Sequence, residues 1–408
     1  MTTTAMAGQA NAAGETEAGW LAELRAYGAE MAAAMPLPIS RAERPWKYYD
    51  ATTLDIGSHT PIVTEPVTLS APAGVEVSTL ENASGELLTL AKQHLGKSVP
   101  VNRSKFTALH YQHLCGAVVV SAGAGVEAGE PVRITRDYAT ADGSLATPHT
   151  LIVTGANARV SVIEDFRSGA DDLLVLPVVE LVPGPGSSIR YTVIHLWGEN
   201  TRVFSEQRTI TARDSSITSL AVAVGGAVVK SHIESSLEGR GSSSELLALT
   251  YGYADQHIDF YTLQDHIGPD TRSDLLFKAA LTDEARSVYY GLTRVGLGAR
   301  NADANQENRN LILSDGAKAD SDPVLEILTN DVIRVSHGAT AGPVDQDSLF
   351  YLQARGIPYE AAEQMLVQAF LGQVLDRIPD RRLRTEVAAM VGIDASDASD
   401  ASDETELS

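Results

Sequence analysis

A long strand-forming stretch with no helical segment inside it restricts the fold of this chain more than any other feature. Between about residues 112 and 335, short segments rich in Val, Ile, Thr and Tyr alternate with turns rich in Gly, Asp, Asn and Ser. β-Branched and aromatic residues favour extended backbone, and the turn residues separate one strand from the next. The clearest expected strands span residues 117–121, 151–154, 160–164, 173–182, 189–197, 203–211, 217–224 and 246–253.

So many short strands in succession predict a sandwich, a barrel or a solenoid. A solenoid is usually visible as an internal repeat, but this sequence shows no strict repeat. The pattern of residues therefore predicts a mainly β fold and leaves its topology open.

Segments with helical periodicity lie on both sides of the β stretch. In each of them apolar residues recur at spacings of three and four, and proline or glycine stands at the end. The expected helices span residues 20–31, 87–95, 345–355, 358–378 and 383–390.

These patterns divide the chain into five parts. Residues 1–19 and 394–408 lack apolar periodicity and are expected to be disordered tails, the second of them acidic. Residues 20–111 form a helical and mixed region, residues 112–343 the β core, and residues 344–393 a C-terminal helical region.

Charge and cysteine content limit the partners and the compartment. The chain has 53 acidic residues against 31 Lys plus Arg, so its net charge of -22 should repel nucleic acids and anionic membranes. Its single cysteine, Cys115, excludes an internal disulfide and fits a reducing compartment. The first basic residue is Arg25, and no apolar run reaches the roughly 20 residues of a membrane span. We therefore expect a cytoplasmic protein.

Motifs for catalysis are weak. Gly96-Lys97-Ser98 matches only the end of a phosphate-binding loop and follows a predicted helix, so we expect no ATP hydrolysis by this chain. His257, Asp259 and His266, with Asp265 beside them, could contribute to a metal site, or they could form hydrogen-bonded pairs in the β core. Strand alternation would place the first two on one face.

Several blocks of sequence between residues 256 and 374 stand out in a fixed order. They are 266–273 (HIGPDTRS), 306–308 (QEN), 311–314 (LILS), 323–327 (PVLEI), 331–340 (DVIRVSHGAT) and 349–357 (LFYLQARGI). In order and spacing these blocks resemble the SufB/SufD family of iron–sulfur cluster assembly proteins. Residues 44–48, Arg-Pro-Trp-Lys-Tyr, resemble more weakly the amino-terminal segment of SufD.

The resemblance implies a right-handed parallel β-helix with helical regions at both ends. It also implies two protein partners, a SufB-like subunit that pairs with the β-helix and a SufC-like ATPase that docks on residues 345–378. The residues expected to bind partners in the C-terminal region are Leu349, Phe350, Tyr351, Arg355, Met365 and Phe370.

The resemblance also implies that His337 is a cluster or metal ligand at the interface, because SufD-type members place a histidine at the paired interface near a SufB cysteine. The position two residues earlier can hold cysteine in SufD, but here it is Val335. The acceptor cysteine of SufB is absent as well, since residues 306–310 contain none, and this favours SufD over SufB. We expect no tightly bound cofactor in the chain alone; a cluster held at the interface would need the partner's thiolates.

We therefore interpret the chain as a non-catalytic SufD-type scaffold subunit of a SufBCD complex. Two alternatives stay open. One is a β-helix enzyme that acts on acidic polysaccharides, and the other is an autonomous metal-binding protein that uses His257, Asp259 and His266. Cys115 is expected to be a small buried apolar residue.

Overall fold

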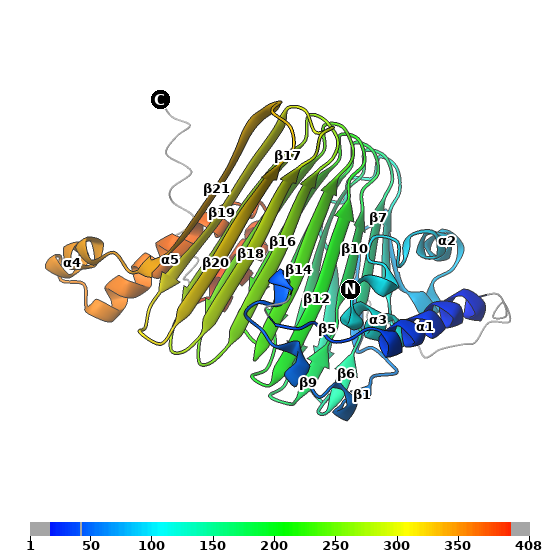
Figure 1. Cartoon of the computed structure of the whole chain (residues 1–408), viewed down its shortest axis with the longest axis horizontal. Helices are drawn as coiled ribbons and strands as arrows, with labels where there is room; N and C mark the ends of the chain where they lie inside the picture. The colour runs from blue at the N-terminus through cyan, green and yellow to red at the C-terminus, as the bar shows by residue number, and fades with distance from the viewer. Residues whose placement is uncertain (1–16, 41–42, 393–408) are drawn as a thin grey trace.

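The computed structural model describes residues 17–40 and 43–392, so the expected tails lie outside it except for residues 17–19. The fold is mainly β: a parallel β-solenoid of about eight turns with helices at both ends (Figure 1). This confirms the predicted parallel β-helix. Residues 17–19, expected to be part of a tail, begin the first helix.

Each turn of the solenoid contributes one strand to each of two sheets, and consecutive turns pair in parallel. The first sheet, called sheet A, has 12 strands: β1 (Thr60–Pro61), β3 (Val75–Thr79), β4 (Val118–Ala122), β6 (Ser144–Ala146), β7 (His149–Thr154), β9 (Leu173–Val175), β10 (Val178–Val182), β12 (Thr201–Ile210), β14 (Val228–Leu237), β16 (His257–His266), β18 (Arg286–Val295) and β20 (Lys318–Ile327).

The second sheet, called sheet B, has nine strands. They are β2 (Val67–Ser70), β5 (Val132–Tyr138), β8 (Arg159–Ser168), β11 (Ser188–Leu196), β13 (Ser216–Ala223), β15 (Ser243–Gly252), β17 (Arg272–Leu281), β19 (Ala302–Ile312) and β21 (Val332–Pro343). The single strand expected over 173–182 is in fact two strands, β9 and β10, with Pro177 between them. Proline has no N–H to donate to a sheet, which explains the break.

The turns that connect sheet A to sheet B share one backbone feature. A residue with positive φ recurs there in successive turns, and Asp214 and Asp270 adopt it as well as Gly241. The N–H of each such residue donates to a carbonyl of the following turn, for example Asp214 N to Arg240 O at 2.9 Å. Asn, Asp and Gly tolerate this left-handed conformation best. The six such residues are Asn157, Gly186, Asp214, Gly241, Asp270 and Asn301.

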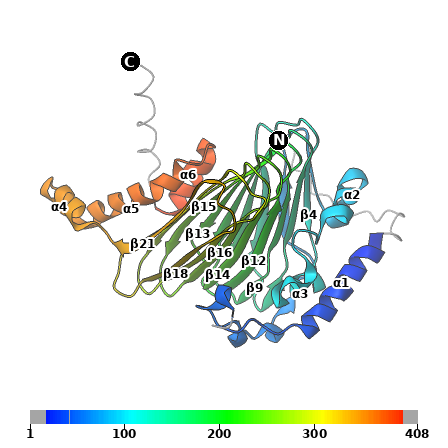
Figure 2. The same cartoon turned by 45° about the horizontal axis from the view of Figure 1, so that its top comes forward.

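Among the described residues six α-helices flank the solenoid, three toward each end of the chain. Those at the N-terminus lie beside the first turns, and α5 and α6 cover part of sheet B (Figure 2). An unexpected helix follows Ser104, whose side chain accepts from the Thr107 N–H while Thr107 bonds back to the Ser104 N–H. The helices are α1 (Glu17–Ala34), α2 (Gly85–His94), α3 (Lys105–Gln112), α4 (Gln346–Ala354), α5 (Tyr359–Leu375) and α6 (Arg381–Met390).

The segment that leads from α1 to the solenoid crosses the outer face of sheet A. Trp46 is buried and stacks on Phe106 and Phe204, with ring centroids 5.3 and 5.9 Å apart. One residue on, the Lys47 ammonium reaches Asp322 of β20 at 2.9 Å. The segment therefore contacts both early and late turns of the solenoid.

The interior between the sheets is apolar over most of its length, but its first turns enclose a buried charged network. Arg136 on β5 is fully buried between two carboxylates, with Nε 2.9 Å from Glu164 and Nη1 3.5 Å from Glu65. Tyr138 and Tyr191 donate to the same two carboxylates at 2.6 and 2.7 Å. Every charge in the network is therefore met by a partner, as burial requires.

No helix among the described residues combines the length and the apolar character needed to cross a membrane.

We predict that Arg136→Met lowers the free energy of unfolding by about 3–5 kcal/mol, because it leaves two buried carboxylates without their cation. Urea unfolding followed by circular dichroism measures the change. Arg159→Met is the matched control, because Arg159 lies on the same sheet and both it and its partner Glu127 are exposed; it should cost less than about 1 kcal/mol. Equal stability of the two variants would contradict the prediction.

Candidate functional site

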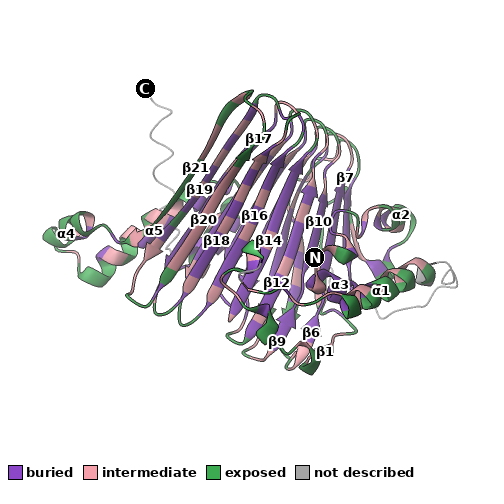
Figure 3. Cartoon of the chain, viewed as in Figure 1, coloured by how far each residue is buried: buried purple, intermediate pink, exposed green. Residues whose placement is uncertain are grey.

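The two ends of the solenoid are finished in different ways. At the first end, each sheet terminates in a short antiparallel strand: β3 with 5 residues in sheet A and β2 with 4 in sheet B. At the last end the terminal strands are β20 with 10 residues and β21 with 12, and both are largely exposed or half-buried. Figure 3 shows this change in exposure along the solenoid. Long edge strands carry unpaired N–H and C=O groups that can pair with another chain.

His337 lies on β21 at this open end and faces the interior side of the last turn. It is in register with Gln306 of β19, whose buried amide donates to the Gly291 carbonyl at 3.2 Å and accepts from the Thr293 hydroxyl at 2.9 Å. Residues in register on parallel strands share a face. The imidazole is nevertheless exposed, because no further turn among the described residues covers it.

The layer beneath the last turn is polar. Asn308 and Asn310 are buried and joined by an amide hydrogen bond of 2.8 Å. Ser321 of β20 donates to Asn308 at 2.5 Å. His337 therefore stands at the boundary between a hydrogen-bonded polar layer and the surface.

Exposed apolar side chains border the open end. Ile327 is the last residue of β20 and Leu328 follows it; they are 43% and 50% exposed, and Ile333 on β21 is 65% exposed. Apolar side chains next to unpaired strand edges are typical of surfaces that bind protein.

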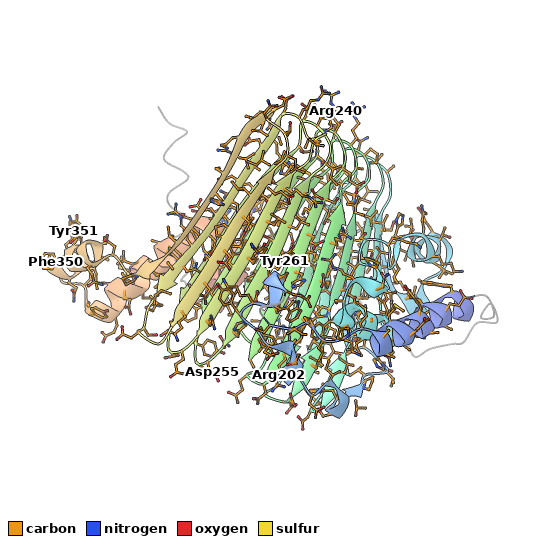
Figure 4. All side chains as sticks on the ribbon, in the orientation of Figure 1. Arg202, Arg240, Asp255, Tyr261, Phe350 and Tyr351 are labelled. Atoms are coloured by element: carbon orange, nitrogen blue, oxygen red, sulfur yellow. The ribbon has the colours of Figure 1, made fainter. Side chains whose placement is uncertain are left out.

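Residues 345–378, which contain α4 and α5, are called the arm here; α4 and the first half of α5 project beyond the sheets (Figure 1), and the second half of α5 packs on sheet B. Asp345 caps α4 through the Ser348 N–H, and Gly356 with φ +89° follows the helix, as the sequence predicts. Figure 4 shows Phe350 and Tyr351 on the part of the arm farthest from the sheets, where they are 71% and 55% exposed.

The six residues expected to bind partners have different environments. Phe350, Tyr351, Met365 and Arg355 are exposed, and the Arg355 guanidinium lies 4.4 Å from the centre of the Tyr351 ring. Leu349 is only 3% exposed, so its side chain is not part of the free surface.

Phe370 is half-buried and belongs to the contact between the arm and the solenoid. Lys278 of β17 lies under it, with Nζ 4.2 Å from the ring centre and 2.7 Å from both the Phe370 carbonyl and the Gln373 side chain. Burial, with a contribution from Arg309, lowers the pKa of Lys278 to about 8. Apolar side chains make up much of the rest of this contact, and Lys278 is a polar anchor for α5 among them.

The residues of the alternative metal site do not come together. His257 Nε2 lies 3.7 Å from Asp259, as strand alternation predicts, but Asp259 is bonded to Lys230 at 2.6 Å. His266 lies on the opposite face of β16 and bonds to the hydroxyls of Thr271 and Ser273. Among the residues that the structure describes, no group of three or more His, Cys, Asp or Glu is arranged to hold a metal ion.

Cys115 and the stretch from Gly96 to Ser98 have structural environments. The Cys115 thiol is buried and bonds to the Ile62 carbonyl, and burial together with Glu65 raises its pKa to about 12. Such a thiol is a poor nucleophile and a poor ligand at neutral pH.

The backbone N–H groups of Gly96 and Ser98 donate to Glu180 at 2.6 and 2.7 Å. This stretch, which follows α2, therefore binds a carboxylate of its own chain.

These features define a parallel β-solenoid with one capped end, one open end and a projecting helical arm. The chain belongs to the SufBD family of the SUF system, because the family profile "SUF system FeS cluster assembly, SufBD core domain" matches residues 137–370.

Curated relatives agree with this family. The chain is 30% identical over 303 residues to an iron-sulfur cluster assembly SufBD family protein of Mycobacterium tuberculosis, covering 72% of this chain and 74% of the relative. It is 26% identical over 317 residues to the iron-sulfur cluster assembly protein SufD of Bacillus subtilis, covering 75% and 72%. It is 25% identical over 328 residues to SufB of the same organism, covering 78% and 70%.

We predict that Lys278→Met changes how stability depends on pH. Because the pKa of Lys278 is lower in the folded chain than its ordinary value of 10.5, unfolding takes up a proton between about pH 8 and 10.5, and raising the pH through this window favours the folded wild type. The urea midpoint of wild type relative to the variant should rise from pH 7 to pH 9.5. Exposed Lys92→Met is the control and should follow wild type; an unchanged difference between Lys278→Met and wild type at the two pH values would refute the prediction.

Proposed function

We propose that this chain is a SufD-type scaffold subunit for iron–sulfur cluster assembly in the cytoplasm. It pairs with a SufB-like subunit through the open end of the solenoid and docks a SufC-like ATPase through the helical arm. It has no catalytic centre of its own, and its role is to hold two partners in a fixed relation and to present a nitrogen ligand.

The observation that carries this proposal is the open end itself. Two long unpaired edge strands, an exposed apolar border and an inward-facing His337 lie on one surface. A second solenoid with free edges could continue both sheets by backbone hydrogen bonds. His337 would then be enclosed between the two chains.

Sulfur content supports the SufD type over the SufB type. The chain has one cysteine, which is buried at the opposite part of the molecule, and residues 306–310 next to His337 contain none. Imidazole is a ligand for iron, but a cluster also requires thiolates or sulfide. A SufB-like partner would supply them.

The arm supports the second partner. Phe350 and Tyr351 are large aromatic side chains that are 71% and 55% exposed. Aromatic and arginine residues dominate the binding energy of protein interfaces.

We predict that a tagged chain co-purifies with SufB-like and SufC-like subunits under anaerobic conditions. The double variant Phe350→Ala/Tyr351→Ala should lose the ATPase subunit, with roughly 10–100-fold weaker binding, and keep the SufB-like subunit. Tyr253→Ala removes a ring that is 43% exposed on a solenoid turn and should retain both. Failure of wild type to retain either partner would overturn the proposed function.

We also predict that His337→Ala leaves the complex intact and lowers the amount of cluster that it carries, measured by iron and sulfide content and by absorption after reconstitution. His59→Ala, which removes a histidine far from the open end, is the control. Full cluster content in His337→Ala would show that His337 is not needed as a cluster ligand.

A further inference from the structure

A row of polar side chains crosses the outer face of sheet B at a single register position. The row begins on β13 and ends on the edge strand β21, and each residue is the direct register partner of the next. Its five members are Thr218, Glu245, Asp274, Asn305 and Ser336.

Hydrogen bonds connect the members of this row. Thr218 donates to Glu245 at 3.3 Å. The Asn305 amide donates to Asp274 at 3.0 Å, and its carbonyl oxygen accepts from the Ser336 hydroxyl at 2.9 Å. Because an amide offers a donor on one side and an acceptor on the other, Asn305 can join a carboxylate on one neighbouring strand to a hydroxyl on the other.

Arg377 connects the row to the helical arm. Arg377 lies two positions after the end of α5, and its Nη1 bonds to both Glu245, at 3.1 Å, and Asp274. It is the cation between two carboxylates on adjacent strands, so the row crosses from β15 to β17 through the end of the arm.

The other end of the row lies next to the proposed ligand. Ser336 precedes His337, and β21 has a single neighbour in its sheet, β19. The register of this pair shifts at Ala302 and Asp303, which weakens the backbone ladder at its start. A side-chain bond from Ser336 to β19 therefore contributes more to holding β21 than it would in the middle of a sheet.

We propose that the row from Arg377 to Ser336 positions β21, and with it His337, and couples this strand to the helical arm. Its role in presenting a ligand rests on the proposed function; its effect on β21 does not. When the end of α5 shifts, Arg377 leaves Asp274. The hydrogen bonds of Asn305 to Asp274 and to Ser336 then change, and with them the position of the edge strand β21. Ser336 and Asn305 are thus positioning residues for His337.

The first test compares Ser336→Val with Ser336→Thr. These side chains have nearly the same shape, but only threonine keeps the hydroxyl that donates to Asn305. In the full chain, amide hydrogen exchange of residues 332–343 should be about threefold to tenfold faster in Ser336→Val, the factor that one hydrogen bond contributes, and near wild type in Ser336→Thr. Equal exchange in both variants overturns the proposal.

The second test starts from the arm. Arg377→Met should also speed exchange at residues 332–343, and combining it with Ser336→Val should add little, because both changes break the same row. Arg202→Met is the matched control: Arg202 is 37% exposed like Arg377, but it pairs with Asp172 on the other side of the molecule. Independent, additive effects of the two changes, or no effect of Arg377→Met, exclude coupling.

The third test uses the ATPase subunit. Its binding to the arm should change exchange at residues 332–343 in wild type and in Ser336→Thr, but not in Ser336→Val. If the ATPase does not bind wild type, the proposed function fails, but the first two tests still show whether the row positions β21 and couples it to the arm. If it binds and residues 332–343 respond equally in all three chains, the proposed coupling fails and the proposed function stands.

Discussion

Parallel strands stacked in register are the constraint on which the rest of this structure depends. Each turn obtains its backbone hydrogen bonds only from the turns on either side, so a stack always leaves two edges to be dealt with. Here the chain closes the first edge with short antiparallel strands and leaves the last one long and unpaired. The surface that we propose for pairing with another subunit is thus a consequence of how the solenoid ends.

Much of the architecture can be predicted from the sequence, but the repeat cannot. Strand positions follow from β-branched residues, and the C-terminal helices follow from Asp345, Gly356 and apolar periodicity. The turn-to-turn repeat is not visible in the sequence because equivalent positions of successive turns require only a residue that tolerates positive φ, not one particular residue. Asp214, Gly241 and Asp270 occupy the same left-handed position in successive turns. Helix α3 is not among the helices expected from the sequence, although Ser104 and Thr107 form a capping box at its start.

Part of the candidate site can likewise be predicted from the sequence, and part cannot. Resemblance to a family identified His337, but its inward orientation depends on its register with Gln306, 31 positions earlier, which no local pattern reveals. The arm was located, yet residue type could not separate exposed Phe350 from buried Leu349 or from Phe370, which packs over Lys278. Amphipathic helices use the same side chains for docking to their own chain and for binding a partner.

The chemistry of the open end agrees with a division of labour between subunits. A thiolate would be the natural ligand for a cluster, but the cysteine of this chain is buried and its pKa is raised. What the last turn offers is an imidazole above a layer of amides and a hydroxyl, groups that hydrogen-bond without holding a cluster alone. On the proposed function, such an end presents one ligand in a fixed place and leaves sulfur to the subunit that pairs with it. The position of β21 then matters more than the metal affinity of the His337 imidazole. A single weak ligand contributes only where it stands beside the ligands of the partner.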